Sequence, residues 1–303
     1  MIESYPVRQY QALWRGNAVV PLRGWSSISI GGKDRHAFLH NFCTNDVKRL
    51  TIGASCEAFI TSVKGKSIGH GFVGCLADEL IFIGAPGQAA AIVAHLDRYI
   101  IREDVQLADT TETRSHLLQV GNVAPPTNGF SINGLTPTTG WIVSFAPEAD
   151  SAIVAGLVGV GFVAVEEPAF NIARIEMGFP LFGVDFDENN LPQEVGRDRE
   201  AISFTKGCYL GQETVARIDA LGHVNQRIVG VRFLANIMPA DACDLTQAGA
   251  VVGRVTSADY SLEVKSPLGV AMVRRDANSI GTRLMSAVGD CEVTEFPGRK
   301  LVS

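Results

Sequence analysis

The chain has 303 residues, of which 46% are hydrophobic and 19% charged, and its formal net charge is −6. That length suffices for two or three domains with ordinary packed cores, and the negative charge argues against a broad nucleic-acid-binding surface. The sequence has no run of eighteen apolar residues and no basic N-terminal region leading into an apolar stretch. We therefore expect neither a membrane span nor secretion, and we expect the protein in the cytoplasm.

Six cysteines are scattered along the chain: Cys43, Cys56, Cys75, Cys208, Cys243 and Cys291. They form no C-x-x-C pair and no Cys/His cluster with the spacing of zinc or iron–sulfur ligands. Reduced thiols are the rule in a cytosolic chain of this size. We therefore predict free cysteines and no metal site.

The first hundred residues predict helices and a meander. Helices are expected over Val7 to Arg15, Asp34 to Phe42 and 87–100, with extended segments at Trp25 to Ile30 and 104–108. Residues 54–62, 67–75 and 80–83 alternate like strands separated by turns. The turn at Gly65-Lys66-Ser67 is not a P-loop, because the glycine that such a loop needs five places earlier is Ile60.

The middle of the chain continues as a mixture of strands and helices. Strands are expected at 116–120, 140–145 and 161–165, a helix at 149–158, and a loop rich in proline, asparagine and glycine at 125–134. The elements alternate without the long βαβ regularity of a doubly wound sheet. The sequence therefore predicts an α+β protein with antiparallel sheets.

A helix expected over Ala169 to Met177 carries a carboxylate in an unusual position. Glu176 shares the apolar side with Ile172 and Ile175, whereas Arg174 points away. A carboxylate on a core-facing stripe costs free energy unless donors meet its lone pairs, so Glu176 is a candidate ligand-binding residue. The alternative is a glutamate at the edge of the stripe that reaches water.

The stretch Lys206-Gly207-Cys208-Tyr209-Leu210-Gly211-Gln212-Glu213 places a thiol, a cation, an amide and a carboxylate within eight residues. The acidic segment 185–199 before it is expected to be a solvated loop. If Cys208 begins a helix, free backbone N–H groups and Lys206 both favour its thiolate. The alternative is a small buried cysteine at a junction between loop and helix.

The pattern changes beyond Gly222. Short strands at 226–233, 250–256, 261–265, 269–274, 283–286 and 291–295 alternate with turns, which is typical of a small β-barrel. We place the domain boundary there. Residues 1–222 form the body, with two subdomains whose boundaries lie near 50 and 110, and residues 223–303 form the barrel.

The string K-G-C-Y-x-G-Q-E at 206–213 is similar to the signature of the YgfZ-like branch of the glycine-cleavage T-protein (aminomethyltransferase) family. Residues 38–47 resemble its F-L-x-x-x-x-T-N-D-V stretch, and residues 174–183 resemble R-x-E-x-G-x-x-L-x-G. Residues 253–257 and 267–271 resemble G-x-V-T-S and P-x-G-x-A of the T-protein C-terminal barrel. The resemblance thus touches the front, middle and end of the chain in the order of the family.

This resemblance implies two interleaved ferredoxin-like units that form a folate-binding body, followed by an antiparallel barrel. It implies tetrahydrofolate or a one-carbon derivative as ligand, with Glu176 accepting two hydrogen bonds from the pterin ring. It implies partners among iron–sulfur enzymes or their assembly factors, an indirect link to tRNA modification, and no direct contact with nucleic acid or membrane. Cys208 would be the functional thiol and Lys206 its electrostatic partner. Further candidates around the folate cleft are Asn45, Asp46, Tyr209, Gln212 and Glu213.

Two other functions stay open. Family members that transfer an aminomethyl group carry an essential aspartate in the strand after the first meander turn, and residues 65–73 contain none. His70 in that strand could replace it as an acid or base, or could be a packed structural histidine. The second alternative is a non-catalytic folate-sensing scaffold, for which we expect a fully buried Cys208.

Overall fold

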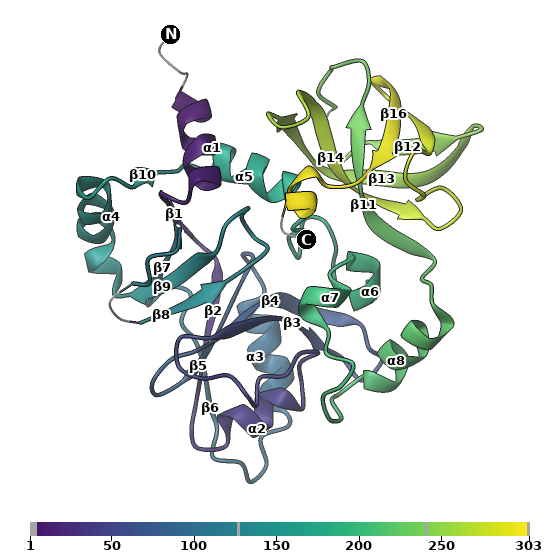
Figure 1. The fold of residues 1–303 in the computed structure, drawn as a ribbon. Helices are drawn as coiled ribbons and strands as arrows, with labels where there is room; N and C mark the ends of the chain where they lie inside the picture. The colour runs from purple at the N-terminus through teal and green to yellow at the C-terminus, as the bar shows by residue number, and fades with distance from the viewer. Residues whose placement is uncertain (1–4, 126–127, 240–241, 302–303) are drawn as a thin grey trace.

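The computed structural model describes residues 5–125, 128–239 and 242–301 (Figure 1). The described residues form two five-stranded sheets and a closed six-stranded barrel. The barrel lies to one side of the two sheets, and the C-terminal segment returns to the centre, where the three parts approach one another. The mixed α+β class predicted from the sequence is confirmed.

The first sheet has the order β3-β4-β5-β2-β6 with antiparallel neighbours throughout. Its predicted meander is formed, and helices α2 and α3 pack against it around a shared apolar core. In the register of β3 and β4, Glu57 lies opposite Phe72 and His70 opposite Phe59. The elements are β2 (Ser26–Gly31), α2 (Arg35–His40), β3 (Ser55–Thr61), β4 (Ser67–Cys75), β5 (Leu80–Gly84), α3 (Ala89–Asp97) and β6 (Gln106–Asp109).

The second sheet has the order β10-β1-β7-β9-β8, and its only parallel pair among the described strands is β1 with β10. Phe72 and Ile83 of the first sheet share a core with Leu118 and Phe130 of the second, which joins the two sheets. Strands β1 and β8 were not predicted. The elements are α1 (Tyr5–Arg15), β1 (Ala18–Pro21), β7 (Ser115–Val120), β8 (Gly129–Ile132), β9 (Gly140–Phe145), η1 (Pro147–Ala149), α4 (Asp150–Gly159), β10 (Val163–Ala164) and α5 (Glu167–Glu176).

The segment 185–199 corrects a prediction, because most of it is buried and is not a solvated loop. Asp185 is buried and pairs with Arg174 at 3.0 Å, and it also accepts a hydrogen bond from Ser257 of the barrel. Arg174, expected to point away from the core, is therefore buried as well. Paired charges let this polar segment pack inside. Helix α6 (Pro192–Val195) lies within this segment and α7 (Asp198–Ala201) begins at its end. Helix α8 (Gln212–Leu221) follows later in the chain.

The barrel closes in the order β11-β14-β13-β12-β15-β16, with Val231, Phe233 and Leu245 among the residues that fill it. Two details differ from the prediction. Strand β13 runs without interruption to Ser261, so the segment 261–265 is a turn, and strand β12 was not predicted. The elements are β11 (Gln226–Phe233), β12 (Asp244–Gln247), β13 (Ala250–Ser261), β14 (Ser266–Arg274), β15 (Arg283–Ser286), β16 (Gly289–Thr294) and η2 (Pro297–Leu301).

All six cysteines are free thiols in the described structure. Across residues 5–125, 128–239 and 242–301, no three His, Cys, Asp or Glu side chains are grouped so that they could hold a metal ion. Within the same ranges, no helix has the length and apolar character that crossing a bilayer requires.

Candidate functional site

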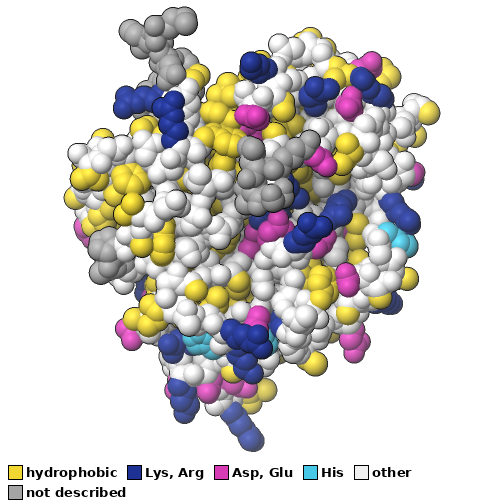
Figure 2. Space-filling view, viewed as in Figure 1, with side chains coloured by type: hydrophobic (Ala, Val, Ile, Leu, Met, Phe, Trp, Pro, Cys, Tyr) yellow, Lys and Arg dark blue, Asp and Glu magenta, His cyan; other side chains and the backbone are white. Residues whose placement is uncertain are grey.

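A cavity of about 1280 Å³ lies where the two sheets, the segment around α7 and the barrel meet. Its walls come from β3, β8, residues 196–200, β11 and the chain after β16. Figure 2 shows basic and acidic side chains close together at the centre of this face, between the barrel and the lower sheet. The volume is above that of ordinary small-molecule pockets, so the cavity has room for a cofactor-sized ligand.

Three buried side chains form an ionic cluster beside the cavity. Arg197 donates to both oxygens of Glu57, at 2.8 and 2.5 Å, and His70 Nε2 lies 2.8 Å from Glu57 Oε1. Burial alone would raise the pKa of Glu57, but the charge of Arg197 and the hydrogen bonds from Arg197 and His70 lower it to about 2. Glu57 therefore stays ionised at neutral pH and is a poor proton acceptor.

His70 is a packed residue of this cluster. Its ring stacks on Phe59 with 4.5 Å between centroids, lies 5.4 Å from Phe179, and is 2% exposed. Among the described residues, the His70 ring nitrogens make one hydrogen bond, from Nε2 to Glu57. This geometry favours the structural alternative for His70 over a role as acid or base.

Glu176 lies at the junction of α1, α5 and the barrel. Its carboxylate accepts hydrogen bonds from Tyr10 Oη at 2.6 Å, Ser261 Oγ at 2.5 Å and the backbone N–H of Glu263 at 3.2 Å, and the residue is fully buried. Burial raises the pKa of Glu176, and these hydrogen bonds oppose that rise. Met177 beside it lines the cavity, but Glu176 does not. The stripe position thus reflects an internal hydrogen-bonded carboxylate, and pterin binding by Glu176 stays a prediction.

Lys206 of the signature is buried and bonded to backbone. Its Nζ donates to the carbonyl oxygens of His40 at 2.5 Å, Cys43 at 2.6 Å and Asn45 at 2.9 Å, and lies 4.9 Å from the centroid of the Tyr209 ring. These three acceptors match the three N–H donors of an ammonium group. Lys206 therefore ties the signature loop to the end of α2, and its predicted pairing with the Cys208 thiol stays untested.

The segment Thr44-Asn45-Asp46 forms the other half of this junction. Thr44 Oγ1 donates to Ala201 O at 2.6 Å, while Asn45 Nδ2 donates to the carbonyl oxygens of Glu57 at 2.8 Å and Glu200 at 2.9 Å. Asp46 Oδ1 lies 3.2 Å from Nδ1 of His40, which closes the group. The T-N-D stretch thus supports the cavity wall, because its amide holds the backbone of two residues that line the cavity.

Cys208 is exposed, and it does not begin a helix. Helix α8 starts only at Gln212, so the condition under which a helix N-terminus would favour this thiolate is not met. The reason is Gly211, whose φ of 82° forms a turn before the helix. A Cβ on Gly211 would lie 2.4 Å from Ser62 O, so the signature needs glycine where this loop meets the meander turn.

The remaining signature residues differ in exposure. Tyr209 is buried and packs into the apolar cluster between the body and the barrel, and burial raises the pKa of its phenol. Gln212 is half-buried at the start of α8, and Glu213 is exposed. The structure thus brings together Lys206, Asn45, Asp46 and Tyr209 in one junction, with Glu176 at another.

Several cavity residues were not found from the sequence: Glu57, Arg197, Asp198, Arg227 and Arg299. The alternating charges of residues 197–200 were the available signal, but such a run is usually a solvated face. Arg299 donates to three backbone carbonyls at the cavity, those of Met177, Gly178 and Gly196. Burial, together with the nearby Arg197, lowers its pKa to about 10.

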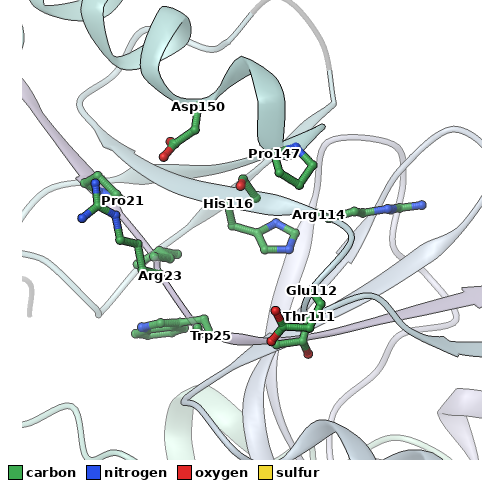
Figure 3. A pocket seen from close by; sticks show the side chains of 12 residues that line it. Pro21, Arg23, Trp25, Thr111, Glu112, Arg114, His116, Pro147 and Asp150 are labelled. Atoms are coloured by element: carbon green, nitrogen blue, oxygen red, sulfur yellow. The ribbon is translucent and has the colours of Figure 1, made fainter.

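A second pocket of about 200 Å³ lies between the turn after β1 and the start of α4 (Figure 3). Trp25, His116 and Asp150 are drawn around it, and Arg114 is directed away toward its ion pair with Glu79. Burial, with a smaller effect of Arg114, lowers the pKa of His116 to about 4. This pocket shares no lining residue with the large cavity.

The arrangement of two sheets and a closed barrel is also found in a solved structure. The crystal structure of glycine cleavage system aminomethyltransferase T from Bartonella henselae matches with a TM-score of 0.82 over 95% of this chain and 89% of that chain, at 18% identity. The profile of the glycine cleavage T-protein C-terminal barrel domain matches residues 226–295. The fold is therefore that of the T-proteins.

Sequence relatives refine this assignment. The tRNA-modifying protein YgfZ of Yersinia enterocolitica is 25% identical over 87% of this chain and 90% of its own length. The mitochondrial iron–sulfur cluster assembly factor IBA57 homolog of Mycosarcoma maydis is 28% identical over 71% of this chain, and the match spans 57% of that protein. The chain therefore has the fold of the T-proteins and is similar in sequence to the YgfZ and IBA57 proteins.

Proposed function

We propose that this protein binds tetrahydrofolate or a one-carbon derivative and assists the assembly or repair of iron–sulfur enzymes, and through them supports tRNA modification. The observation that carries the proposal is the combination of a cofactor-sized cavity with an exposed thiol in the YgfZ-like signature. The names of the relatives support it, since one is an iron–sulfur cluster assembly factor and another a tRNA-modifying protein.

The cavity lining suits the chemistry of a folate. Such a ligand has a flat polar pterin, an aromatic middle and an anionic glutamate tail, so it needs apolar contacts as well as donors and acceptors. Phe72, Met177 and Phe296 offer apolar surface, and Arg227 and Arg299 offer donors to an anion. When bound, the folate would supply one-carbon chemistry, and these residues would hold and orient it.

Cys208 is the residue that we assign to the iron–sulfur function. Its exposure leaves the thiol accessible to a partner protein, whereas a scaffold that uses Cys208 for packing would bury it. Lys206 anchors the loop that presents the thiol through its three carbonyl contacts. Gln212 and Glu213 follow at the start of α8, where they can contact a partner or orient the loop.

Aminomethyl transfer is the second candidate, and the Bartonella fold neighbour is its support. The strand that carries the aspartate in such enzymes has none here, and its histidine is bound to Glu57. Glu57 is itself kept ionised by Arg197, so neither group is a ready base at the cavity. Purified protein incubated with the other glycine-cleavage components tests this candidate directly.

The test of the proposed function has two parts. Calorimetric titration of the purified protein with tetrahydrofolate should give saturable binding. In cells that lack the protein, the wild type should restore iron–sulfur enzyme activity, while Cys208→Ser should not. Cys243→Ser is the matched control, since this half-buried barrel thiol is not part of the signature. Full rescue by Cys208→Ser would remove the thiol from the proposal.

A further inference from the structure

Asp198, the first residue of α7, lines the large cavity and has an unmet hydrogen-bonding group. Its Oδ2 accepts a hydrogen bond from Arg227 Nη2 at 2.6 Å. Its Oδ1 is enclosed and has no hydrogen-bond partner among the residues that the structure describes. An enclosed acceptor without a donor costs free energy, and a ligand donor at the cavity wall would remove that cost.

The other carboxylates near the cavity are already occupied. Both oxygens of Glu57 accept from Arg197. Glu200 faces Arg197 Nη1 at 3.4 Å and is 40% exposed, so water solvates it. Glu295 also has a partner, and Glu176 is not in the cavity wall and meets three donors elsewhere. Asp198 is therefore the carboxylate of this group with an oxygen left for a ligand.

The electrostatic surroundings of Asp198 agree with a missing donor. Burial raises the pKa of its carboxyl group to about 6, and the negative charges of Glu200 and Asp219 add to the rise. Arg227 and Arg299 oppose it, but not enough to restore the usual value. A ligand that donates hydrogen bonds to the ionised carboxylate would lower this pKa and would bind more tightly as Asp198 loses its proton.

We propose that Asp198, rather than Glu176, is the carboxylate that receives the ring N–H and exocyclic amine of the pterin. This inference rests on the proposed function, because it takes the ligand to be a folate. A carboxylate offers two oxygens with lone pairs for parallel hydrogen bonds, and Oδ2 can accept from Arg227 and from a ligand at the same time.

The experiment is calorimetric titration with tetrahydrofolate at pH 7.5 of the wild type, Asp198→Asn and Glu176→Gln. Asp198→Asn should weaken binding at least tenfold, because the amide keeps the shape but places an N–H₂ against a ligand donor. Glu176→Gln should bind within about threefold of the wild type. Asp219→Asn is the matched control, since it removes one nearby charge from the exposed side of α8.

A pH series separates ligand contact from a merely structural role. Between pH 7.5 and 5.5 the affinity of the wild type should fall as Asp198 gains a proton, while the affinity of Asp198→Asn should change less. A flat wild-type profile, or equal affinity of Asp198→Asn and the wild type at pH 7.5, overturns the assignment while the folate function stands. A wild type that does not bind tetrahydrofolate overturns both.

Discussion

The buried charges of the signature loop and of the cavity wall differ in how fully they are hydrogen-bonded. Lys206 is surrounded by three carbonyl acceptors, so each of its N–H donors is used inside the protein. Asp198 has one oxygen bound to Arg227 and one with no partner in the described structure. The lysine of the signature therefore builds the loop, whereas the aspartate outside the signature is left available to a ligand.

The Arg197–Glu57 pair lies between these extremes, and we expect the largest loss of stability there. Arg197→Met leaves a buried carboxylate without its counter-charge, which typically costs about 3–5 kcal/mol of unfolding free energy. Urea unfolding at pH 7 measures the loss. The double variant Glu57→Gln/Arg197→Met removes both charges and should recover most of it. A single variant that loses less than ~1 kcal/mol would contradict the burial of this pair.

Lys206→Met should have the next largest effect. The methionine keeps the apolar stem but leaves the carbonyls of His40, Cys43 and Asn45 without this donor, at about 1 kcal/mol or more for each one that stays dry. We expect a loss of about 3 kcal/mol in urea unfolding. Lys66→Met is the control, because Lys66 Nζ makes one exposed contact with Asn189 O. Equal small losses in both variants would mean that Lys206 does not anchor the loop.

The contribution of Asp198 to the free energy of unfolding should depend on pH. Its folded-state pKa of about 6 lies above the ordinary value of 3.8, so its ionised form is disfavoured in the folded protein. The stabilising contribution is full below about pH 4 and is lost as the pH rises through 6. The wild type should lose about 2 kcal/mol relative to Asp198→Asn between pH 4 and pH 7, because the pKa differs by about two units and each unit corresponds to about 1.4 kcal/mol. Parallel stability curves for the two proteins would argue against this burial.

The same contrast explains what the sequence could predict. The spacing of apolar residues located β4, β9, β11 and α5. A strand or helix that buries one face has apolar residues at the period of that element, so its pattern is visible in the sequence. Strand β8 was hidden in a segment rich in proline, asparagine and glycine, and β12 has four residues. Such short strands are held by neighbours that are distant in sequence, and local pattern carries little of that information.

The site follows the same rule. The signature and T-N-D stretches were found because they are contiguous, and the structure brings them together through Lys206 and Asn45. The cavity wall, by contrast, depends on contacts such as that between Glu57 and Arg197. These residues are 140 positions apart, so no contiguous motif contains both. Periodicity could mark Glu176 as an unusual carboxylate, but could not tell whether a ligand or Tyr10 and Ser261 would supply its donors.

Cys208→Ser should have the smallest effect on stability and a clear effect on reactivity. The thiol is exposed, so its replacement should change the unfolding free energy by no more than about 0.5 kcal/mol. Iodoacetamide should label the folded wild type fastest at Cys208, as peptide mass analysis can show, because Cys43, Cys75 and Cys291 are buried. The fast phase should vanish in Cys208→Ser and persist in Cys243→Ser. If Cys208 reacted no faster than the buried thiols, the signature cysteine would be a packing residue. Asp198 would then be the one group in this comparison that is left available to a ligand or partner.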